Sequence, residues 1–573
     1  MSDVYEKVMD LAKRRGFVWP TSECYGAVAG FIDYGPLGAM MKRRIENVWR
    51  AFYVVREGYY EIECPTIGQE AIYIASGHVK GFSDKMFQCP HCNEFLRADH
   101  VVEGAGEIVN AGTMSAEALA ETLAPIECPL CKKRIGEVVV FCFSLMFSTS
   151  IGPGSQRTGY LRPETAQGIF TDFTRLLRFY RDKLPFGAVQ IGKSYRNEIS
   201  PRQGMIRLRE FTQAEAEIFV HPDQKKHPHF ARYADYTMEL LGYPEQLAGK
   251  PAVAISMADA VAEGRIANEY VAYYIALTHQ MLTRLGIRPG RLRFRQHLPD
   301  ELAHYAEDCW DAEILSDRFG WVETVGIADR TDYDLRAHAS QSGDSFTVFI
   351  PFDEVKRESR RQIVADMGAL GPRFRGKAKA VADAIANSTP TEEGVYVEVG
   401  GEQVLITPDL YKVREVEIEV RGEEVMPHVI EPSYGIDRIC YAVLENCFEE
   451  EEVDGEMRNV LHLPPEIAPV QVAVFPLMNR DDLDTIAWGL TTTLKHQGLQ
   501  AEYDDSGAIG RRYRRQDEIG TPFAVTIDYD TREDRTVTLR DRDSMRQVRV
   551  VLDEVPELVR RLTSRTLLFE EIR

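Results

Sequence analysis

A pair of predicted strands joined by a basic loop restricts the possible folds of this chain more than any other part of the sequence. The segments 189–195 and 210–220 alternate in the manner of strands, and the loop 199–207 between them contains proline and glycine. On a strand, Arg196 and Glu198 point to the same face. A guanidinium can fork onto phosphate oxygens and stabilise negative charge that develops there. The hairpin therefore suggests a phosphate site, although by itself it also fits a surface hairpin held by ion pairs.

A later segment, 431–438, weakens the second interpretation. A strand there leads into a helix that begins at Gly435, and Arg438 lies in the first helical turn. Glycine allows the backbone to approach a ligand closely. Within the hairpin, Arg207 precedes Phe211 by four residues, so an arginine can hold a further phosphate while the ring stacks on a base. Arg438 can then cover the other face of that base.

Length and charge exclude some classes of protein. The 573 residues, 44% hydrophobic and 27% charged, are typical of a globular protein with roughly three to five domains. No apolar run of about 18 residues and no secretory signal are present, so we expect no membrane-spanning helix and a cytoplasmic location. The net charge of −21 argues against unspecific binding of polyanions, but leaves room for a specific nucleic-acid site.

Four of the ten cysteines form two C-x-x-C pairs, Cys89 with Cys92 and Cys128 with Cys131. Each pair can supply two thiolates to a tetrahedral zinc ion, and we expect a structural zinc site with a short helix, 115–123, between the pairs. Two redox or disulfide pairs are the alternative. The remaining cysteines are expected to be buried small hydrophobes in a reducing compartment: Cys24, Cys64, Cys142, Cys309, Cys440 and Cys447.

Periodicity predicts the other elements of the chain. Helices are expected at 37–57, 165–184, 257–285, 377–387 and 435–444, and strands at 59–65, 138–148, 313–327, 346–350, 394–399 and 426–431. The acidic run 449–452 is expected to be a solvated loop. After the two prolines at 464–465, strands and helices alternate to the end.

Taken in order, these segments resemble the three motifs of class II aminoacyl-tRNA synthetases. The helix 37–57 with the strand ending at Pro65 resembles motif 1, the dimerisation element, and the hairpin resembles motif 2. The run Gly435-Ile436-Asp437-Arg438 resembles motif 3. Further segments are similar to the dimeric glycyl-tRNA synthetases of the archaeal and eukaryotic type: 31–38, 95–100, 159–168, 211–215 and 431–435.

The resemblance implies an α+β fold, in which a catalytic core built on an antiparallel sheet carries insertions and is followed by an α/β anticodon-binding domain. The implied domains are 1–88 (core with motif 1), 89–131 (zinc-knuckle insertion), 132–339 (core with motif 2), 340–425 (insertion), 426–465 (core with motif 3) and 466–573 (anticodon binding).

The implied reaction joins glycine to ATP as glycyl-adenylate and transfers the glycyl group to the 3′ end of tRNA(Gly), in a homodimer. Arg196, Arg207 and Arg438 are the implied catalytic residues. Arg196 contacts the α-phosphate, Arg207 holds the γ-phosphate, and Phe211 and Arg438 enclose adenine, while Glu198 meets its amino group. Mg²⁺ bridges phosphates, with Glu313 as candidate ligand, although Glu313 also fits an ordinary strand carboxylate. The wider ATP set adds Asn197, Leu208, Arg209, Glu210, Ile314, Gly435, Ile436 and Asp437.

Glycine offers an ammonium, a carboxylate and a very small Cα. The carboxylates of Glu164, Glu215 and Glu431, with Ser433, are the implied ammonium site, and steric crowding excludes larger amino acids. Packing these carboxylates together is costly unless a cation binds, which favours a site over a structural cluster. Arg97 and Arg162 are expected to balance their charge. The wider glycine set comprises Arg97, Phe211, Thr212, Gln213, Ala214, Pro432, Tyr434 and Gly435.

The C-terminal segment resembles the anticodon-binding domain shared by several class II synthetases. Its implied tRNA contacts are Arg511, Arg512, Tyr513, Arg514 and Arg515, although a solvated helix start is the alternative for any single arginine. Two other functions stay open: a synthetase-like accessory protein that binds nucleic acid without aminoacylation, and a synthetase for serine, threonine, alanine or proline. The ATP-binding arginines favour an enzyme, and the carboxylate set favours glycine.

Overall fold

The chain forms two compact units, each described here by itself. A computed structural model describes residues 3–106, 111–154, 157–199, 201, 203–302, 306–386, 388, 394–399, 402–453 and 455–572. One unit is formed by Met1–Phe346 with Met426–Arg573, and the other by Thr347–Val425. The second unit starts a few residues after the predicted insertion limit of 340, and the six domain limits stay predictions.

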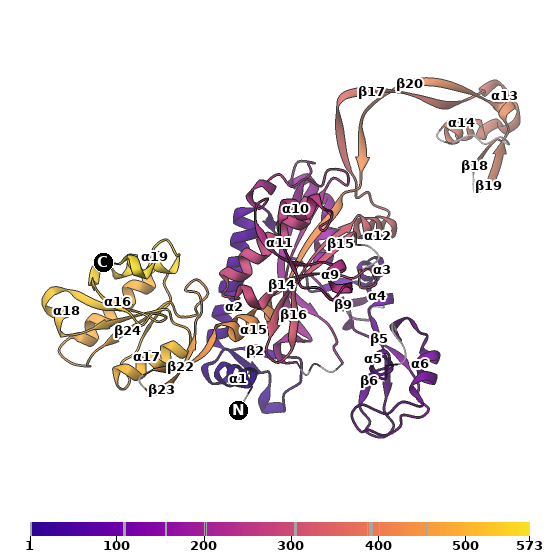
Figure 1. Cartoon of the computed structure of the whole chain (residues 1–573). Helices are drawn as coiled ribbons and strands as arrows, with labels where there is room; N and C mark the ends of the chain where they lie inside the picture. Colours follow the sequence, from indigo (N-terminus) through magenta and orange to yellow (C-terminus); the bar gives the residue numbers. More distant parts are fainter. Residues whose placement is uncertain are drawn as a thin grey trace. The chain divides into compact units, whose positions relative to one another are not determined.

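A nine-stranded sheet forms the centre of the larger unit (Figure 1). Its strands, in spatial order, are β13 (Val253–Ser256), β12 (Thr237–Leu241), β14 (Leu292–Gln296), β15 (Asp308–Ser316), β16 (Gly320–Thr331), β21 (His428–Gly435), β11 (Glu210–Val220), β10 (Phe186–Tyr195) and β3 (Tyr60–Glu61). Neighbours are antiparallel except for the pairs β12–β14 and β10–β3. The predicted hairpin is therefore the pair β10–β11, at the side of motif 3 strand β21.

Three helices pack on one face of this sheet, and the opposite face carries the polar groups of the candidate site. The helices are α2 (Pro36–Arg50), α11 (Glu269–Arg284) and α15 (Ile436–Cys447). Along β11, Ala214, Ala216 and Ile218 belong to the hydrophobic core shared with these helices. Because side chains alternate on a strand, Gln213, Glu215 and Glu217 point to the opposite face. This alternation is what places the carboxylates of the candidate site.

Several elements differ from their predicted form. The helix predicted at 37–57 is α-helical to Arg50 and continues as a π-helical turn, Ala51–Arg56. The helices predicted at 165–184 and 257–285 are each divided, into α7 (Ala166–Thr171) with α8 (Phe173–Phe179) and into α10 (Met257–Ala262) with α11. The strand predicted at 138–148 is likewise two strands, β7 (Phe141–Ser144) and β8 (Ser148–Ser150).

The acidic run 449–452 is a strand, so the predicted loop is wrong. It lies in β22 (Phe448–Val453), which pairs with β23 (Glu456–Leu461). Within this pair, Glu451 accepts from the buried Arg458 at 2.9 Å. The acidic segment can form a strand because Arg458 neutralises Glu451, while the charges of Glu449 and Glu450 are exposed to solvent.

The cysteine segment forms a small module with its own core. Strands β5 (Ser83–Gln88), β6 (Phe95–Arg97) and β7 form a sheet beside α5 (Ala98–Gly104) and α6 (Ala116–Leu123). Phe87, Val102 and Leu119 are among its buried residues. The predicted helix at 115–123 is α6, and Ser115 caps it by accepting from the Ala118 N–H at 3.2 Å.

The end of the chain is a separate α/β layer structure, as the alternation predicts. Its sheet has the order β25 (Ala501–Tyr503), β24 (Val472–Pro476), β26 (Phe523–Ile527), β27 (Thr536–Asp541) and β28 (Gln547–Val551). The helices are α16 (Leu483–His496), α17 (Ile509–Glu518), α18 (Tyr529–Asp534) and α19 (Val555–Thr563). The other elements of the larger unit are α1 (Val4–Arg15), β1 (Val18–Pro20), β2 (Ile32–Tyr34), β4 (Ile67–Gln69), α3 (Glu70–Ala75), α4 (His78–Gly81), β9 (Thr158–Leu161), α9 (Tyr243–Leu247) and α12 (Tyr333–Ser342).

The smaller unit is a long two-stranded ribbon that carries a compact end. The ribbon pairs β17 (Val348–Ala365) with β20 (Tyr411–Val425), so the strand predicted at 346–350 is much longer than expected. Helices α13 (Met367–Phe374) and α14 (Ala378–Ala386) pack with β18 (Val395–Val399) and β19 (Glu402–Ile406) around Leu370, Val381 and Ile406. The last residue of the helix predicted at 377–387, Asn387, lies outside the described residues.

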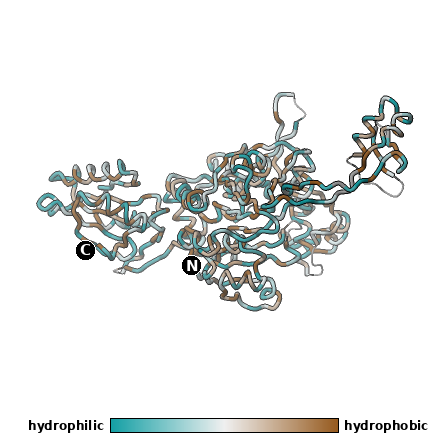
Figure 2. Tube along the Cα trace, turned by 90° about the horizontal axis from the view of Figure 1, so that it is seen from above, coloured by the Kyte–Doolittle hydropathy of each residue, from teal (hydrophilic) through white to brown (hydrophobic). Residues whose placement is uncertain are grey.

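Hydrophobic and hydrophilic residues are interspersed over short distances along the coloured parts of the trace (Figure 2). Among the helices of the described ranges, none combines the length and the apolar character needed to cross a membrane.

Candidate functional site

A cavity of about 220 Å³ lies on the sheet face away from the three core helices. The strands β11, β21 and β16 form its floor, and the segment before β11 and the first turn of α15 complete its wall. The residues that line it are Glu164, Arg196, Glu198, Met205, Ile206, Arg207, Leu208, Phe211, Thr212, Gln213, Glu215, Glu323, Thr324, Gly326, Glu431, Ser433, Gly435, Asp437 and Arg438. The cavity thus brings together the arginines of both motifs and the predicted glycine carboxylates.

Glu215 is the most constrained of the carboxylates. Its side chain is 1% exposed. Oε2 accepts from the backbone N–H of Thr165 at 2.8 Å and from its hydroxyl at 2.5 Å. Oε1 accepts from Ser433 Oγ at 2.7 Å and from Gln213 Nε2 at 3.0 Å. Four donors from three segments of the chain therefore hold one carboxylate in place at the cavity wall.

The other carboxylates are held by two basic groups. Arg330 donates to Glu431 Oε2 at 2.5 Å and to Asp334 Oδ2 at 2.8 Å. His78 Nε2 lies 3.5 Å from Glu164 Oε2, and Gln167 donates to the other oxygen of Glu164 at 2.8 Å. Arg330 is thus a further counter-ion of the cluster, beside the predicted Arg162, which is buried and interacts electrostatically with Glu215.

The surroundings of these carboxylates shift their pKa values in different directions. Burial acts to raise the pKa of Glu164, but His78 and Arg330 hold it below its ordinary value. Burial raises the pKa of Glu215, and the charge of Glu164 adds to the effect. Burial also raises the pKa of Glu431, although Arg330 opposes this. The cluster therefore holds fewer negative charges than carboxylates when no cation is bound.

Three arginines line the opposite part of the cavity. The Arg196 guanidinium lies 5.5 Å from the centre of the Phe211 ring and 5.4 Å from that of Phe82. Arg207 pairs with Glu198 at 3.1 Å. Arg438 is held by two backbone carbonyls, of Ile206 at 3.0 Å and of Glu323 at 2.8 Å. The cavity therefore has a cationic part and an anionic part, which suits a phosphate ester joined to an ammonium-bearing group.

Asp437 connects the three motifs and is buried. It accepts from Lys42 of α2 at 2.9 Å, from the Tyr34 hydroxyl at 2.5 Å and from the Thr212 N–H at 2.5 Å. Burial acts to raise the pKa of Asp437, and Lys42 together with these hydrogen bonds lowers it below its ordinary value. Asp437 is therefore a structural anion held by three donors; it also lines the cavity, and its contact with ATP stays a prediction.

Other predicted residues do not line the cavity: Arg97, Asn197, Arg209, Glu210, Ala214, Glu313, Ile314, Pro432, Tyr434 and Ile436. Ala214, Ile314, Tyr434 and Ile436 point into the core beneath the helices, because they occupy the alternate positions of their segments. Tyr434, for example, shares hydrogen bonds with Tyr53 and Thr278 there. Arg209 donates to the carbonyls of Ala29 and Glu198 and so fixes the loop rather than a ligand.

The predicted Mg²⁺ ligand Glu313 does not line the cavity. Its carboxylate accepts from Arg293 at 2.6 Å, outside the cavity. The pairing of β15 with β16 shifts by one residue between Ala312 and Glu313, and this places Glu323 opposite Glu313. Glu323 lines the cavity near Arg438, with an ion-pair distance of 3.5 Å. Of these two facing carboxylates, Glu323 lines the cavity, and the Mg²⁺ contact of Glu313 stays a prediction.

Two further site residues were missed from the sequence. Arg330 lies near the end of β16, and its contact with Glu431 is visible only in the folded structure. Glu217 had a visible pattern, since the run from Ala214 to Glu217 alternates alanine with glutamate and so puts Glu215 and Glu217 on one strand face. The structure places an oxygen of Glu217 within 4.8 Å of Glu215 and Glu431.

The four cysteines predicted to bind zinc come together. Their sulfur atoms all lie within 4.8 Å of one another, with 3.9 Å between Cys89 and Cys131 and 3.9 Å between Cys92 and Cys128. The two turns have the same geometry, because Asn93 N–H donates to the Cys89 carbonyl and the Lys132 N–H donates to the Cys128 carbonyl, each at 2.9 Å. A matched pair of turns is typical of a zinc knuckle and not of separate disulfides.

Two of the other cysteines contradict the prediction of burial. Cys24 and Cys142 are exposed, whereas Cys440 and Cys447 are buried and Cys64 and Cys309 are partly buried. Cys24 lies in the short loop between β1 and β2, and Cys142 lies on the small sheet strand β7, so neither belongs to a segment thick enough to be covered on both sides.

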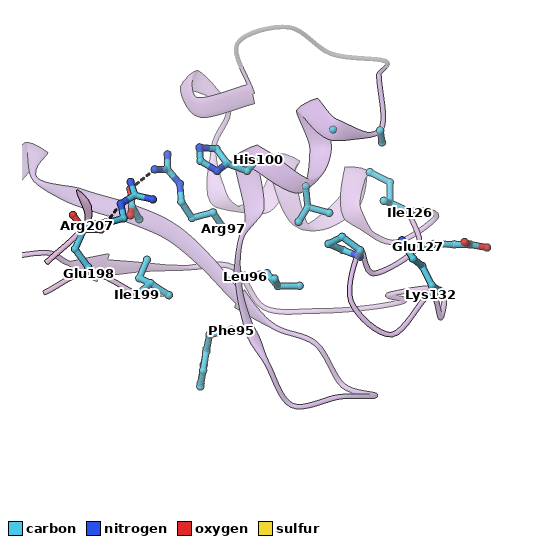
Figure 3. A pocket seen from close by; sticks show the side chains of 15 residues that line it. Phe95, Leu96, Arg97, His100, Ile126, Glu127, Lys132, Glu198, Ile199 and Arg207 are labelled. Carbon is cyan, nitrogen blue, oxygen red and sulfur yellow. Dashed lines mark ion pairs between the residues drawn. The ribbon is translucent and has the colours of Figure 1, made fainter. Parts of the chain in front are cut away.

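A second cavity, of about 590 Å³, lies between the cysteine module and the loop of the hairpin. Figure 3 shows Glu198 and Arg207 at one end and Ile126, Glu127 and Lys132 at the other. Arg97 lines this cavity and pairs with Asp84 at 3.3 Å and with Asp99 at 2.5 Å. Arg97 therefore lies in the wall of this neighbouring cavity, and its contact with glycine stays a prediction.

The predicted anticodon residues divide into two groups. Arg512 is buried, and its guanidinium donates to the carbonyls of Pro476 and Gly507, which is incompatible with a base contact. Tyr513 bonds to Thr526 at 2.6 Å, and Arg515 pairs with Asp504. Arg511 is exposed and Arg514 is partly exposed on the surface of α17. These two remain available for a polyanion.

Comparisons with known proteins agree with this geometry. Residues 153–447 match the family described as "tRNA synthetase class II core domain (G, H, P, S and T)", and residues 471–562 match "Anticodon binding domain". A protein of Methanothrix thermoacetophila named glycine–tRNA ligase is 53% identical over 99% of this chain and 99% of its own. One of Methanocaldococcus jannaschii with the same name is 49% identical over 97% of this chain and 99% of its own.

A solved structure shares the fold. The prolyl-tRNA synthetase of Cryptosporidium parvum matches 97% of this chain and 76% of its own with a TM-score of 0.52, at 12% sequence identity. The predicted fold, a synthetase core of α+β type followed by an anticodon-binding domain, is confirmed.

Proposed function

Because the chain belongs to the class II aminoacyl-tRNA synthetases, and among them to the family of the glycine–tRNA ligases, we propose that it activates glycine with ATP and transfers the glycyl group to the 3′ end of tRNA(Gly). The observation that carries the proposal is the divided cavity, in which buried carboxylates face three arginines. A cluster of carboxylates that cannot all be ionised alone is suited to a small ammonium group, and the arginines are suited to the phosphates of ATP.

Activation requires positioning and charge stabilisation rather than a protein nucleophile. A glycine carboxylate oxygen attacks the α-phosphorus of ATP, the bond to the bridging oxygen breaks, and pyrophosphate leaves with the electron pair. Arg196, whose guanidinium lies over the Phe211 ring, stabilises the charge that develops on the α-phosphate. Arg207 leaves its partner Glu198 to bind the γ-phosphate. Phe211 and Arg438 enclose adenine from its two faces.

Recognition of glycine depends on the fixed geometry of its ammonium site. Glu215 and Ser433 are already oriented toward each other across β11 and β21, with Glu164 and Glu431 beside them. An ammonium that donates to such a preoriented set needs little reorganisation. A side chain on the substrate Cα would need space that these groups occupy, which favours glycine over alanine, serine, threonine and proline. The complete set of ATP-binding arginines disfavours an accessory protein without aminoacylation.

Mg²⁺ is expected with ATP in this site. Glu323, a carboxylate that lines the cavity close to Arg438, fits the oxygen-ligand preference of the ion and replaces Glu313 as candidate ligand. When bound, Mg²⁺ supplies neutralisation of phosphate charge.

We propose different surfaces for the binding of tRNA and for the contact with a second subunit. We propose that Arg511 and Arg514, the α17 arginines that keep exposure, contribute to the anticodon contact. The helix α2 with the π-helical turn Ala51–Arg56 and strand β3 is the proposed homodimer element. A cytoplasmic location fits both tRNA as substrate and the reduced thiols of the cysteine module.

The experiment that tests the function is charging of a tRNA(Gly) transcript by the purified protein with labelled glycine and ATP. Label is expected in acid-precipitable RNA, and its release by mild base identifies an ester at the terminal ribose. Omission of ATP and replacement of the transcript by tRNA for alanine are the controls. Absence of charged tRNA together with retained tRNA binding would support the accessory protein instead.

A structural Zn²⁺ held by Cys89, Cys92, Cys128 and Cys131 is a separate proposal. Tetrahedral zinc with Zn–S bonds of about 2.3 Å sets the sulfur atoms about 3.8 Å apart, and the cross-turn distances of 3.9 Å fit this value. We expect about one zinc per chain by mass spectrometry of metals, and its loss in Cys89→Ser, because three thiolates bind the ion much less tightly. Cys142→Ser, an exposed cysteine of the same module, is the matched control and should keep its zinc. A zinc-free wild type after purification with added zinc would contradict the proposal.

A further inference from the structure

Glu217 is a buried carboxyl group without a partner. Its side chain is 0% exposed, and neither of its oxygens has a hydrogen-bond partner among the described residues. Leaving a buried polar group unpaired is costly, and an unpaired charge is more costly still. The group lies beside the ammonium site, because one of its oxygens is within 4.8 Å of Glu215 and of Glu431. Packing in the core therefore gives no reason for a carboxyl group at position 217. The group is close enough to Glu215 and Glu431 to influence the ammonium site.

The register of the sheet fixes which carboxyl faces Glu217. Ile218 pairs with Ile430 and Glu215 pairs with Ser433 across β11 and β21, so Glu217 stands opposite Glu431. Side chains directly opposite on antiparallel strands have Cβ atoms about 5 Å apart, and like charges there destabilise the pair. Two buried carboxyls at this separation retain one proton between them.

The groups around Glu217 and Glu431 favour Glu431 as the acceptor of a hydrogen bond from Glu217. On β11, Glu215 already accepts four hydrogen bonds. On β21, Glu431 accepts from Arg330, the donor that reaches it among the described residues. The remaining charged or titratable groups are Glu164, Asp334, His78 and His338, of which the last has its pKa lowered by burial. Because carboxylates outnumber basic groups around Glu217, the protonated, neutral form of Glu217 is favoured.

The titration of Glu217 agrees with the geometry. Burial and the facing charge of Glu431 raise the pKa of Glu217 well above its ordinary value, against the opposing influence of Arg330. An acid whose pKa is raised is protonated below that pKa and loses its proton only as the pH rises through it. Burial and the charge of Glu431 therefore both favour the neutral acid, which can donate an O–H, over the carboxylate.

We propose that Glu217 is a positioning residue, a neutral carboxylic acid that donates its proton in a hydrogen bond to Glu431 and thereby orients Glu431 toward the ammonium of the substrate. The inference rests on the proposed function of the cavity. No bond to the substrate is made by Glu217 itself. Its hydrogen bond restrains Glu431 from the second side, opposite Arg330, and removes one negative charge from the cluster, so the empty site stays folded without an inorganic cation.

The test compares a neutral mimic with a group that cannot donate. Glu217→Gln keeps an N–H donor of similar shape and cannot ionise, whereas Glu217→Leu fills the space without a donor. In glycine-dependent ATP–pyrophosphate exchange, we expect the glutamine variant to keep the glycine KM within about threefold and the leucine variant to raise it by about tenfold or more, because a lost hydrogen bond to a charged group costs about a factor of ten. The kcat should change less than KM in both.

The matched control is Glu445→Gln, which removes the charge of another buried carboxyl, hydrogen-bonded to Ser316 and the Asp317 N–H and remote from the cavity. It should leave the glycine KM unchanged. A glutamine variant as impaired as the leucine variant would show that an ionised Glu217 is needed and would overturn the proposal. Wild-type behaviour of both variants would also overturn it.

A second measurement does not depend on activity. Infrared difference spectra between the wild type and Glu217→Gln should show the C=O band of one protonated carboxyl at neutral pH, and the band should disappear as the pH rises. Absence of the band overturns the proposal even if the leucine variant fails to fold. If the wild type shows no glycine-dependent exchange, the proposed function fails, and the band still decides the protonation of Glu217.

Discussion

Replacement of Glu215 by alanine is expected to raise the KM for glycine by at least about 100-fold, or about 2.7 kcal/mol. The ammonium loses the neighbouring negative charge of Glu215, and an interaction with a charged group is worth about 1.5–3 kcal/mol. In addition, the Thr165 N–H and hydroxyl and the Ser433 hydroxyl lose their acceptor inside a buried site. The measurement is ATP–pyrophosphate exchange as a function of glycine concentration. The KM for ATP should change little, because the adenine and phosphate contacts lie in the other part of the cavity.

A matched control for this substitution is Glu239→Ala, an exposed glutamate on β12, the second strand of the same sheet. It should leave both KM values as they are. An unchanged glycine KM in Glu215→Ala, with the protein folded, would remove Glu215 from the ammonium site and with it the main argument for glycine.

Replacement of Arg196 by alanine is expected to lower kcat by about a factor of 1000, which is the usual effect of removing one group that stabilises charge in a transition state. Arg196 is placed for this role by packing, since its guanidinium lies against Phe211 and Phe82 at the junction of the two parts of the cavity. Glycine and ATP should still bind, so the loss appears in kcat. Arg196→Lys should recover only part of the rate, because a point charge cannot fork onto two oxygens.

The control here is Arg175→Ala, an exposed arginine on α8 that pairs with Asp172 at 2.6 Å and faces away from the cavity. Single-turnover formation of the adenylate separates binding from chemistry for each variant. A kcat for Arg196→Ala within about threefold of the wild type would mean that the α-phosphate charge is stabilised by another group.

Local patterns were sufficient for the parts of the fold that depend on local physics. The hairpin β10–β11 was visible because strand alternation and a Pro- and Gly-containing loop are short-range features. The two cysteine turns were visible for the same reason. Glu217 was predictable in principle, since the alternation of alanine and glutamate on β11 puts it beside Glu215.

Side-chain direction and register could not be obtained in this way. Glu323 lines the cavity and the facing Glu313 does not, because Glu313 is bound by Arg293 of the next strand. Arg512 follows a polar pattern, yet its guanidinium is enclosed by the carbonyls of Pro476 and Gly507, which come from other segments. Arg330 acquires its role only when the sheet brings it to Glu431. Each of these errors concerns a long-range contact, for which one sequence without the fold has no pattern.

The most direct measurement of the central claim is ATP–pyrophosphate exchange by the wild-type protein with each standard amino acid in turn. Glycine alone is expected to sustain exchange, because the ammonium site has no room beyond the Cα. Alanine and serine should remain at the level seen without amino acid. Exchange with another amino acid instead of glycine, or no exchange with any, would contradict the assignment of this cavity as the glycine-activating site.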